Sequence, residues 1–192
     1  MHRQDEILST LRETGAFLEG HFLLSSGLHS AEYVQCARLL RFPDKAAALL
    51  SVVAEQLRDI EIDVVCGPAM GGILVSYELA RLLSKESLFT ERVEGKMTLR
   101  RGFELMHGAK VLIAEDVVTT GRSTLETKEA IERSGARAVA VACIADRRAS
   151  DTDIGIPVFS AAKFDIKVYE PIDCPMCRLG NVPTKPGSRT TY

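Results

Sequence analysis

The 192-residue sequence has no tryptophan, few aromatic residues of any kind and almost no excess of charge of either sign. It holds 24 lysine and arginine residues against 26 aspartate and glutamate residues, so its formal net charge at pH 7 is −2. General nucleic-acid binders and membrane-surface proteins are usually basic, which argues against both classes. No apolar run approaches the ~20 residues of a membrane span, and the first six residues lack the apolar core of a secretory signal. We therefore expect a cytoplasmic protein without a nucleic-acid or membrane partner.

The cysteines do not form the pattern of a disulfide framework. All five lie in a chain of ordinary globular composition, mostly inside apolar runs, which is typical of reduced thiols in a cytosol. The length suffices for one well-buried domain and leaves room for a small appendage.

Short apolar runs alternate with helical patterns over most of the chain. Buried strands are expected at residues 62–66, 88–90, 111–115, 138–145 and 157–164. Helices between the earlier strands predict an α/β fold with a doubly wound, mainly parallel sheet.

The N-terminal part follows a different pattern. Ile7, Leu11, Phe17 and Leu18 suggest an amphipathic first helix, with Gly15 as its end. A hydroxyl-rich turn near residues 24–30 lies between two apolar segments and predicts a hairpin. We expect three parts, listed here by their bounds: a small hood at 1–42, a core at 43–170 and an irregular tail at 171–192.

The most informative stretch begins as the apolar run 111–114, which is typical of a strand buried on both faces. Glu115 and Asp116 close the strand, and a hydroxyl-rich turn at 119–123 leads into a helical pattern. Free backbone N–H groups and the positive helix end both favour a phosphate at such a turn. Gly121 permits close backbone approach and a positive φ. The turn has neither the Gly-Lys-Ser/Thr of a P-loop nor the Gly-x-Gly-x-x-Gly of a dinucleotide site.

The two carboxylates invite two interpretations. Neighbours in a strand point to opposite sides, but at a frayed strand end Glu115 and Asp116 can both reach a sugar's hydroxyl groups or a hydrated Mg²⁺. In the plainer interpretation, Asp116 caps a turn and Glu115 is a solvated strand end. The strand before them and the Thr-Thr-Gly-x-Ser turn after them favour the functional interpretation.

Three further segments are candidates for ligand contact. The glycine-rich turn 67–72 lies between a strand and a helix, where backbone N–H groups can face an anion, although such turns also occur as plain βα connections. The segment 91–108 is basic, polar and without clear periodicity, as expected of a functional loop or of a solvated one. Arg147 follows a strand, where open α/β sheets bind ligands, whereas Arg148 suits a surface ion pair with Asp146 or Asp151.

The Glu-Asp-Val-Val-Thr-Thr-Gly stretch at 115–121 closely resembles the phosphoribosyl-diphosphate (PRPP) motif of type I phosphoribosyltransferases. Its form is most similar to that of the orotate phosphoribosyltransferase family, whose N-terminal hood carries a Ser-Gly-x-x-Ser hairpin like that at 26–30. The resemblance implies the type I phosphoribosyltransferase fold and transfer of phosphoribose from PRPP to orotate. Mg²⁺ is the implied cofactor, held mainly by PRPP with Glu115 and Asp116 nearby. A homodimer is implied as well, with loop 91–108 lent to the partner's site.

The resemblance also implies individual residue roles. The implied catalytic residues are Arg92, Lys96, Glu115 and Asp116. The implied PRPP contacts are those four together with Ala69, Met70, Gly71, Val117, Val118, Thr119, Thr120, Gly121, Arg122 and Ser123. The implied orotate contacts are Ser25, Ser26, Gly27, Tyr33, Thr119 and Arg147.

Four positions depart from the pattern of relatives. Lysines are common at the places of Ser25, Gly71 and Val93, and a histidine at that of Thr98. The loop at Gly71 is therefore expected to act through its backbone alone. Two rivals stay open: another nucleobase phosphoribosyltransferase, and a non-catalytic PRPP-sensing regulator, which would need a basic face or a DNA-binding domain.

The pair Cys174 and Cys177 has the Cys-x₂-Cys spacing that supplies half of a structural zinc site. No second pair is evident in the sequence. Histidine or cysteine from elsewhere would have to complete the site, and the plainer interpretation is two reduced thiols in a tight turn.

Overall fold

The computed structural model of the protein describes residues 3–24 and 26–186. The strands are β1 (Phe17–Leu23), β2 (His29–Val34), β3 (Val64–Pro68), β4 (Glu86–Val93), β5 (Lys96–Leu99), β6 (Lys110–Val118), β7 (Arg137–Asp146), β8 (Val158–Lys163) and β9 (Val168–Tyr169). The helices are α1 (Arg3–Glu13), α2 (Ala37–Leu40), α3 (Pro43–Gln56), α4 (Gly71–Leu83), α5 (Arg122–Arg133) and α6 (Pro175–Arg178), with a 3₁₀ turn at Pro171–Asp173.

Six strands form the main sheet in the order β5-β4-β3-β6-β7-β8. All neighbouring pairs are parallel except β4 and β5, which are antiparallel. The order changes direction between β3 and β6, and ligands of doubly wound sheets bind outside the carboxyl ends of strands at such a switch point. The predicted doubly wound sheet is confirmed.

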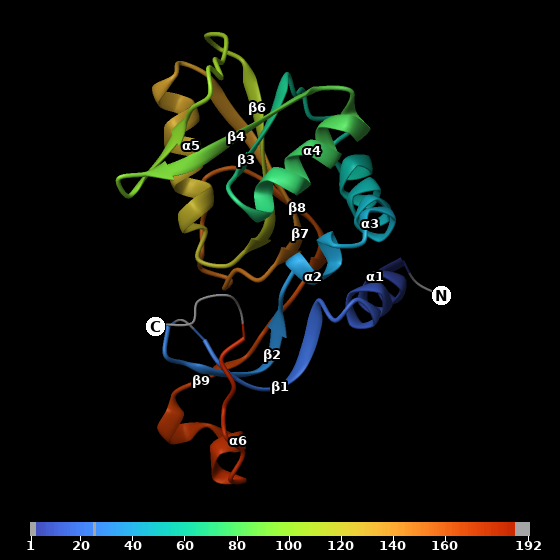
Figure 1. Ribbon diagram of the computed structural model, residues 1–192, viewed down its shortest axis with the longest axis vertical. Coiled ribbons are helices and arrows are strands. Elements are labelled where there is room, and N and C mark those ends of the chain that lie inside the picture. Colours follow the sequence, from blue (N-terminus) through green and yellow to red (C-terminus); the bar gives the residue numbers. More distant parts are fainter. Residues whose placement is uncertain (1–2, 25, 187–192) are drawn as a thin grey trace.

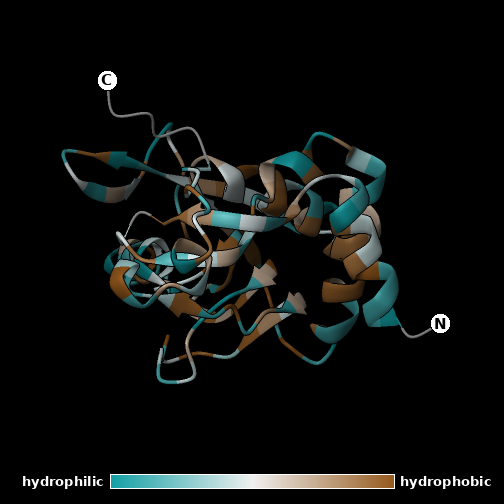
Figure 2. Ribbon diagram, turned by 90° about the horizontal axis from the view of Figure 1, so that it is seen from below, coloured by the Kyte–Doolittle hydropathy of each residue, from teal (hydrophilic) through white to brown (hydrophobic). Residues whose placement is uncertain are grey.

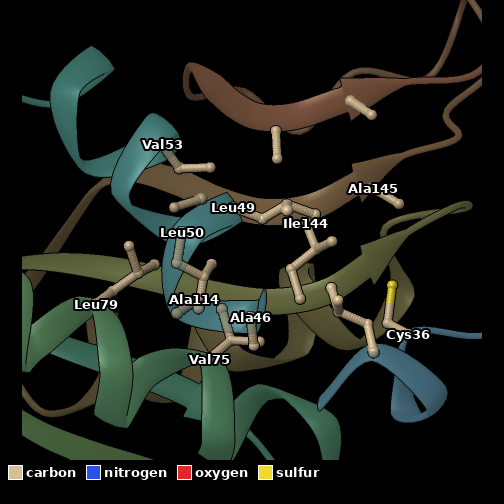
Figure 3. Close-up of a cluster of buried hydrophobic side chains, with 14 of the residues drawn as sticks. Cys36, Ala46, Leu49, Leu50, Val53, Val75, Leu79, Ala114, Ile144 and Ala145 are labelled. Atoms are coloured by element: carbon tan, nitrogen blue, oxygen red, sulfur yellow. The ribbon is translucent and has the colours of Figure 1, made fainter. Parts of the chain in front are cut away.

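Helices cover both faces of this sheet (Figure 1). One hydrophobic cluster joins α1, α3 and α4 to one face, and a second joins α5 to the other. Leu50 and Val53 of α3 meet Val75 and Leu79 of α4 and Ile144 of β7 in the first cluster (Figure 3). Full burial of such side chains contributes about 1.5–3 kcal/mol each, which makes the sheet a rigid base for the loops at its edge.

A smaller sheet of order β1-β2-β9 forms the hood at the other end of the molecule (Figure 1). Its strands β1 and β2 make the predicted hairpin, with Phe17 opposite Val34 and Leu23 opposite His29. Hydropathy colouring places brown, apolar segments in the interior and teal, polar ones mainly along the outside (Figure 2). Among the described residues, no helix combines the length and apolarity that crossing a bilayer demands.

Three local predictions are wrong. Phe17 and Leu18 belong to β1 and not to the first helix, because Gly15 adopts a φ of +68° after α1 has ended at Glu13. The tail, expected to be irregular, carries the 3₁₀ turn and α6.

The third correction concerns the segment 91–108, which is a loop only in part. Strand β4 continues to Val93, and Glu94 and Gly95 form a two-residue turn into β5. Both turn residues have positive φ, 48° and 84°, as a hairpin turn that matches strand twist requires. The sequence does not reveal this hairpin because β5, the edge strand, has only four residues, and so short an alternation does not stand out among polar neighbours.

Candidate active site

Two carboxylates lie near the carboxyl end of β6, at the switch point of the sheet. The strand runs on to Val118, with Glu115 opposite Cys143 of β7, so it does not fray at Glu115 as expected. The two side chains therefore point to opposite faces of the sheet. Glu115 is only 4% exposed, and Asp116 is half-buried.

Each carboxylate meets the first turn of a different helix. On the α5 side, Ser123 donates a hydrogen bond from its Oγ to Oε1 of Glu115 at 2.5 Å. On the α4 side, a Cβ added to Gly71, the first residue of α4, would lie only 2.3 Å from Oδ2 of Asp116. Both acids are thus placed where the positive end of a helix dipole favours negative charge.

Burial nevertheless dominates the protonation of both groups. Desolvation raises the pKa of Glu115 to about 8, although the Ser123 hydrogen bond opposes the shift. Desolvation also raises the pKa of Asp116, against the opposing hydrogen bond that the Val117 N–H donates to its Oδ1 at 2.8 Å. Such a pair is poised to gain charge when a cation or a developing positive charge arrives.

The contact with Gly71 explains one departure from the pattern of relatives. A lysine or any other side chain at this position would overlap the Asp116 carboxylate unless that carboxylate moved. The Ala69–Met70 peptide before Gly71 is cis. With no side chain at Gly71, the turn at the carboxyl end of β3 presents backbone to Asp116.

The expected phosphate loop has the conformation that the sequence indicates. Gly121 is the N-cap of α5 with a φ of +71°, and an added Cβ would lie 2.2 Å from Cδ1 of Ile154. Thr119 and Thr120 are exposed beside it. Within the described part of the chain, no side chain caps α5, so its first N–H groups are available to an anion.

Arg147 and Tyr33 join the core to the hood. The guanidinium carbon of Arg147 lies 5.7 Å from the centroid of the Tyr33 ring, and its backbone N–H donates to the carbonyl of Val118 at 2.8 Å. Its Nε is buried without a hydrogen-bond partner among the described residues, and burial lowers the pKa of its guanidinium. A buried donor of this kind usually has a partner, which here fits an anionic or carbonyl-bearing ligand.

Arg148 behaves as the sequence predicts. Its Nε and one terminal nitrogen both donate to the Asp146 carboxylate at 2.9 Å. This pairing satisfies the nearly buried Asp146 and leaves Arg147 as the arginine of this turn that faces Tyr33.

Two of the basic residues of segment 91–108, Arg92 and Lys96, lie on the β4–β5 hairpin. Arg92 forms an ion pair with Glu126 of α5 and donates to the Gly95 carbonyl at 2.5 Å. Lys96 is exposed at the start of β5. Glu126 was not predicted from the sequence as the partner of Arg92. Glu126 also pairs with Arg122, four residues before it in α5, and that spacing is visible in the sequence.

The hood turn is described only in part. Ser25 lies outside the described residues. Gly27 has a φ of +87°, and the Ser26 hydroxyl accepts the Leu28 N–H at 3.4 Å. Close to the carboxylates, the Cys36 thiol donates to the Asp116 carbonyl at 3.2 Å, a contact that the sequence did not indicate.

The raised pKa of Glu115 predicts how stability changes with pH in the protein without ligands. An ordinary glutamate pKa of 4.5 in the unfolded chain and one of about 8 in the folded chain mean that the folded state binds the extra proton between these values. The stabilising contribution is therefore complete below the lower pKa and is lost as pH rises through the higher one. Relative to Glu115→Gln, the wild-type free energy of unfolding should fall by up to about 1.4 kcal/mol per pH unit across this range.

Urea unfolding of both proteins at a series of pH values measures this difference. Glu104→Gln, at an exposed glutamate, is the matched control and should run parallel to wild type. A constant offset between Glu115→Gln and wild type would show that Glu115 is ionised in the folded state.

Comparison with known proteins agrees with this geometry. The model of the phosphoribosyl transferase domain family matches residues 37–172. An orotate phosphoribosyltransferase of Caldicellulosiruptor bescii is 47% identical over 186 residues, which cover 97% of this chain and 98% of the relative.

Solved structures share the fold. Orotate phosphoribosyltransferase from Aeropyrum pernix superposes with a TM-score of 0.68 at 24% identity, over 91% of this chain and 98% of that one. UMP synthase from Leishmania donovani superposes with a TM-score of 0.71 at 20% identity, over 83% of this chain and 36% of that longer one. With the site between two helix N-termini and a full-length relative at 47% identity, the chain belongs to the orotate phosphoribosyltransferase family.

Proposed function

We propose that the chain transfers the 5-phosphoribosyl group from PRPP to N1 of orotate, giving orotidine 5′-monophosphate and diphosphate, as in pyrimidine biosynthesis. The observation that carries this proposal is the pair of buried carboxylates on β6, each beside a helix N-terminus at the switch point. The relative at 47% identity supports orotate as the base.

In this proposal, the carboxylates act on the ribose. Loss of diphosphate leaves positive charge on the sugar ring, and preorganised charges stabilise it best in a site of low dielectric constant. Glu115 and Asp116 supply two such charges once the sugar is bound, and their oxygens accept hydrogen bonds from the ribose hydroxyl groups. Because the two side chains leave β6 on opposite faces of the sheet, each carboxylate makes its own contact with the sugar at the end of the strand.

The two helix starts bind the two ends of PRPP. The turn from Thr119 to Ser123 takes the 5′-phosphate through backbone N–H groups and hydroxyls. The backbone of Ala69, Met70 and Gly71 faces the diphosphate. Arg92 and Lys96 are assigned to the same leaving group, which for Arg92 requires release from Glu126.

Mg²⁺ is the proposed cofactor. The carboxylate oxygens of Glu115 and Asp116 are of the hard type that Mg²⁺ prefers. The ion would be held mainly by PRPP and would neutralise the leaving diphosphate. Removing divalent ions should then weaken PRPP binding.

Orotate is placed between the hood and the core. The planar guanidinium of Arg147 pairs with exocyclic oxygens of the pyrimidine, and Tyr33 lies against the same arginine. Ser26, Gly27 and Ser25 are assigned to the hood side of the base. A steady-state assay with PRPP, Mg²⁺ and a panel of nucleobases tests the whole proposal, since activity with a purine or uracil but not orotate would contradict it.

The first prediction from the proposed function concerns Asp116. Asp116→Asn should lower kcat/KM by about 10²-fold or more, the scale of losing a key electrostatic group, while folding stays intact. Asp59→Asn, at an exposed aspartate before the amino end of β3 and so at the opposite edge of the sheet, is the control and should leave kcat/KM unchanged. If thermal stability collapses while activity per folded molecule stays near wild type, Asp116 is only structural.

The second prediction concerns base recognition. Arg147→Ala should raise the KM for orotate far more than the KM for PRPP, because the variant loses a contact to the base alone. Arg147→Lys keeps the charge without the planar fork and should recover only part of the loss. Arg137→Ala, at the start of β7 and thus at the other end of the strand that Arg147 follows, should change neither KM. Equal changes in both KM values would remove Arg147 from the base site.

The third prediction concerns a homodimer in which Arg92 and Lys96 act in the partner's site. The β4–β5 hairpin is at the edge of the sheet and projects from it (Figure 1), as a segment lent to a neighbour requires. Lys96→Ala and Asp116→Asn chains, each nearly inactive, are mixed by unfolding and refolding together. Half the dimers are then hybrids with one intact site of two, so about a quarter of wild-type activity should return.

A mixture of Glu115→Gln and Asp116→Asn is the control for this experiment. Glu115 and Asp116 of any one site come from the same chain, so every site in a hybrid dimer keeps one of the two changes. This mixture should therefore recover no activity. If the Lys96→Ala mixture also recovers none, the hairpin serves its own subunit, as the pairing of Arg92 with Glu126 within one chain would allow.

A further inference from the structure

Four side chains with metal-binding atoms, none of them assigned to a substrate, meet in the hood. They are His21 of β1, His29 at the start of β2, and Cys174 and Cys177 at the beginning of α6. One ligand atom from each of the four lies within 4.8 Å of all the others. The chain brings them together from positions about 150 residues apart in sequence.

The spacing within the cluster matches a tetrahedral site. Nε2 of His21 lies 2.9 Å from Nδ1 of His29 and 3.4 Å from Sγ of Cys174. Sγ of Cys177 lies 3.3 Å from Nδ1 of His29 and 3.8 Å from Nε2 of His21. Zinc bonds of about 2.0–2.1 Å to nitrogen and 2.3 Å to sulfur give tetrahedral edges of roughly 3.4–3.8 Å. These four distances differ from the tetrahedral edges by about 0.5 Å or less, and no pair among the four atoms exceeds 4.8 Å.

The protonation of His21 also suits a metal. Its Nδ1 lies 2.9 Å from the carbonyl oxygen of Asn181, which only accepts hydrogen bonds, so Nδ1 carries the proton. In the neutral ring, the lone pair is then on Nε2 and points into the cluster. A backbone carbonyl that fixes the second ring nitrogen is the usual companion of a metal-bound histidine.

The type of site follows from the ligands and their burial. Two imidazoles and two thiols, with no carboxylate in the group, favour zinc over magnesium or calcium. His21, His29 and Cys174 are at most 8% exposed. Four protein ligands in a closed position make a structural site and leave no open position for catalysis.

The tail segment, defined here as residues 165–186, has little else to hold it in place. Within this stretch, which the structure describes throughout, the one residue of the buried core is Cys174, whereas Ile172, Leu179 and Val182 are 79–86% exposed. Strand β9 pairs with β2 at two positions only, and Thr184 adds hydrogen bonds to β1. Hydrophobic burial therefore contributes little to this attachment.

We propose that His21, His29, Cys174 and Cys177 bind one zinc ion that fastens the tail segment to the hood hairpin, formed by β1 and β2. The two histidines lie on either side of the hairpin turn, so the ion would hold both strands at the base of that turn and tie them to α6 (Figure 1). Binding releases the thiol protons, since thiolate is the ligand form. The site is independent of the transferase proposal, because none of its ligands is assigned to PRPP or orotate.

Metal analysis of full-length protein, expressed with zinc and purified without chelator, tests the site. Wild type should carry close to one zinc per chain, and His29→Ala and Cys177→Ser should each carry about one-tenth of that or less. The matched controls are His107→Ala, at an exposed histidine, and Cys66→Ala, at a buried cysteine of β3, and both should retain the metal. Zinc far below one per chain in wild type, or equal zinc in wild type and the ligand variants, would overturn the proposal.

Two measurements on wild type alone keep the test decisive if the ligand variants fail to fold. Cobalt added to metal-free protein should give the visible bands of tetrahedral, thiolate-bound Co²⁺, and their absence would contradict the site. Removing zinc should speed amide hydrogen exchange in β9 and at residues 181–184 while leaving β6 and β7 unchanged. Unchanged exchange in the tail would show that no ion fastens it, as would a disulfide between Cys174 and Cys177 in the purified protein.

Discussion

The low dielectric environment at the end of β6 is the constraint on which the site depends. Glu115 and Asp116 are withdrawn from water by the sheet and by two helices, and their pKa values rise because of that burial. Burying two neighbouring acids lowers the stability of the fold. Such pairs occur at binding sites, because charge in a dry site interacts strongly with a substrate. The same rigid sheet that buries the acids also keeps them in position.

Two glycines allow the starts of α4 and α5 to approach the end of β6 closely. Gly71 gives the Asp116 carboxylate its space at the start of α4, and Gly121 gives Ile154 its space at the start of α5. Without side chains at these points, both helix N-termini lie close to the strand end. The result is one edge of the sheet at which two helix starts and two acids meet, the kind of place where an anion is favoured.

The hood depends on the core in a different way. Arg147 contacts Tyr33, and the Cys36 thiol contacts the backbone of Asp116, so the hood meets the core next to the carboxylates. The hood sheet itself is small, and small sheets without a large apolar core need further fastening. The proposed zinc ion would supply it by tying the β1–β2 hairpin to the tail segment.

The sequence by itself indicated the main buried strands along the chain, the Glu115–Ser123 motif and an ion pair of Arg148 with a nearby aspartate, because each depends on local pattern or near neighbours. It missed the β4–β5 hairpin, because β5 has only four residues and so short an alternation does not stand out from a polar segment. Only the tertiary structure decided that Asp116 lies against Gly71, that Arg147 lies over Tyr33, and that His21 and His29 meet Cys174 and Cys177. Those contacts join residues far apart along the chain, and their geometry arises only when separate elements pack together.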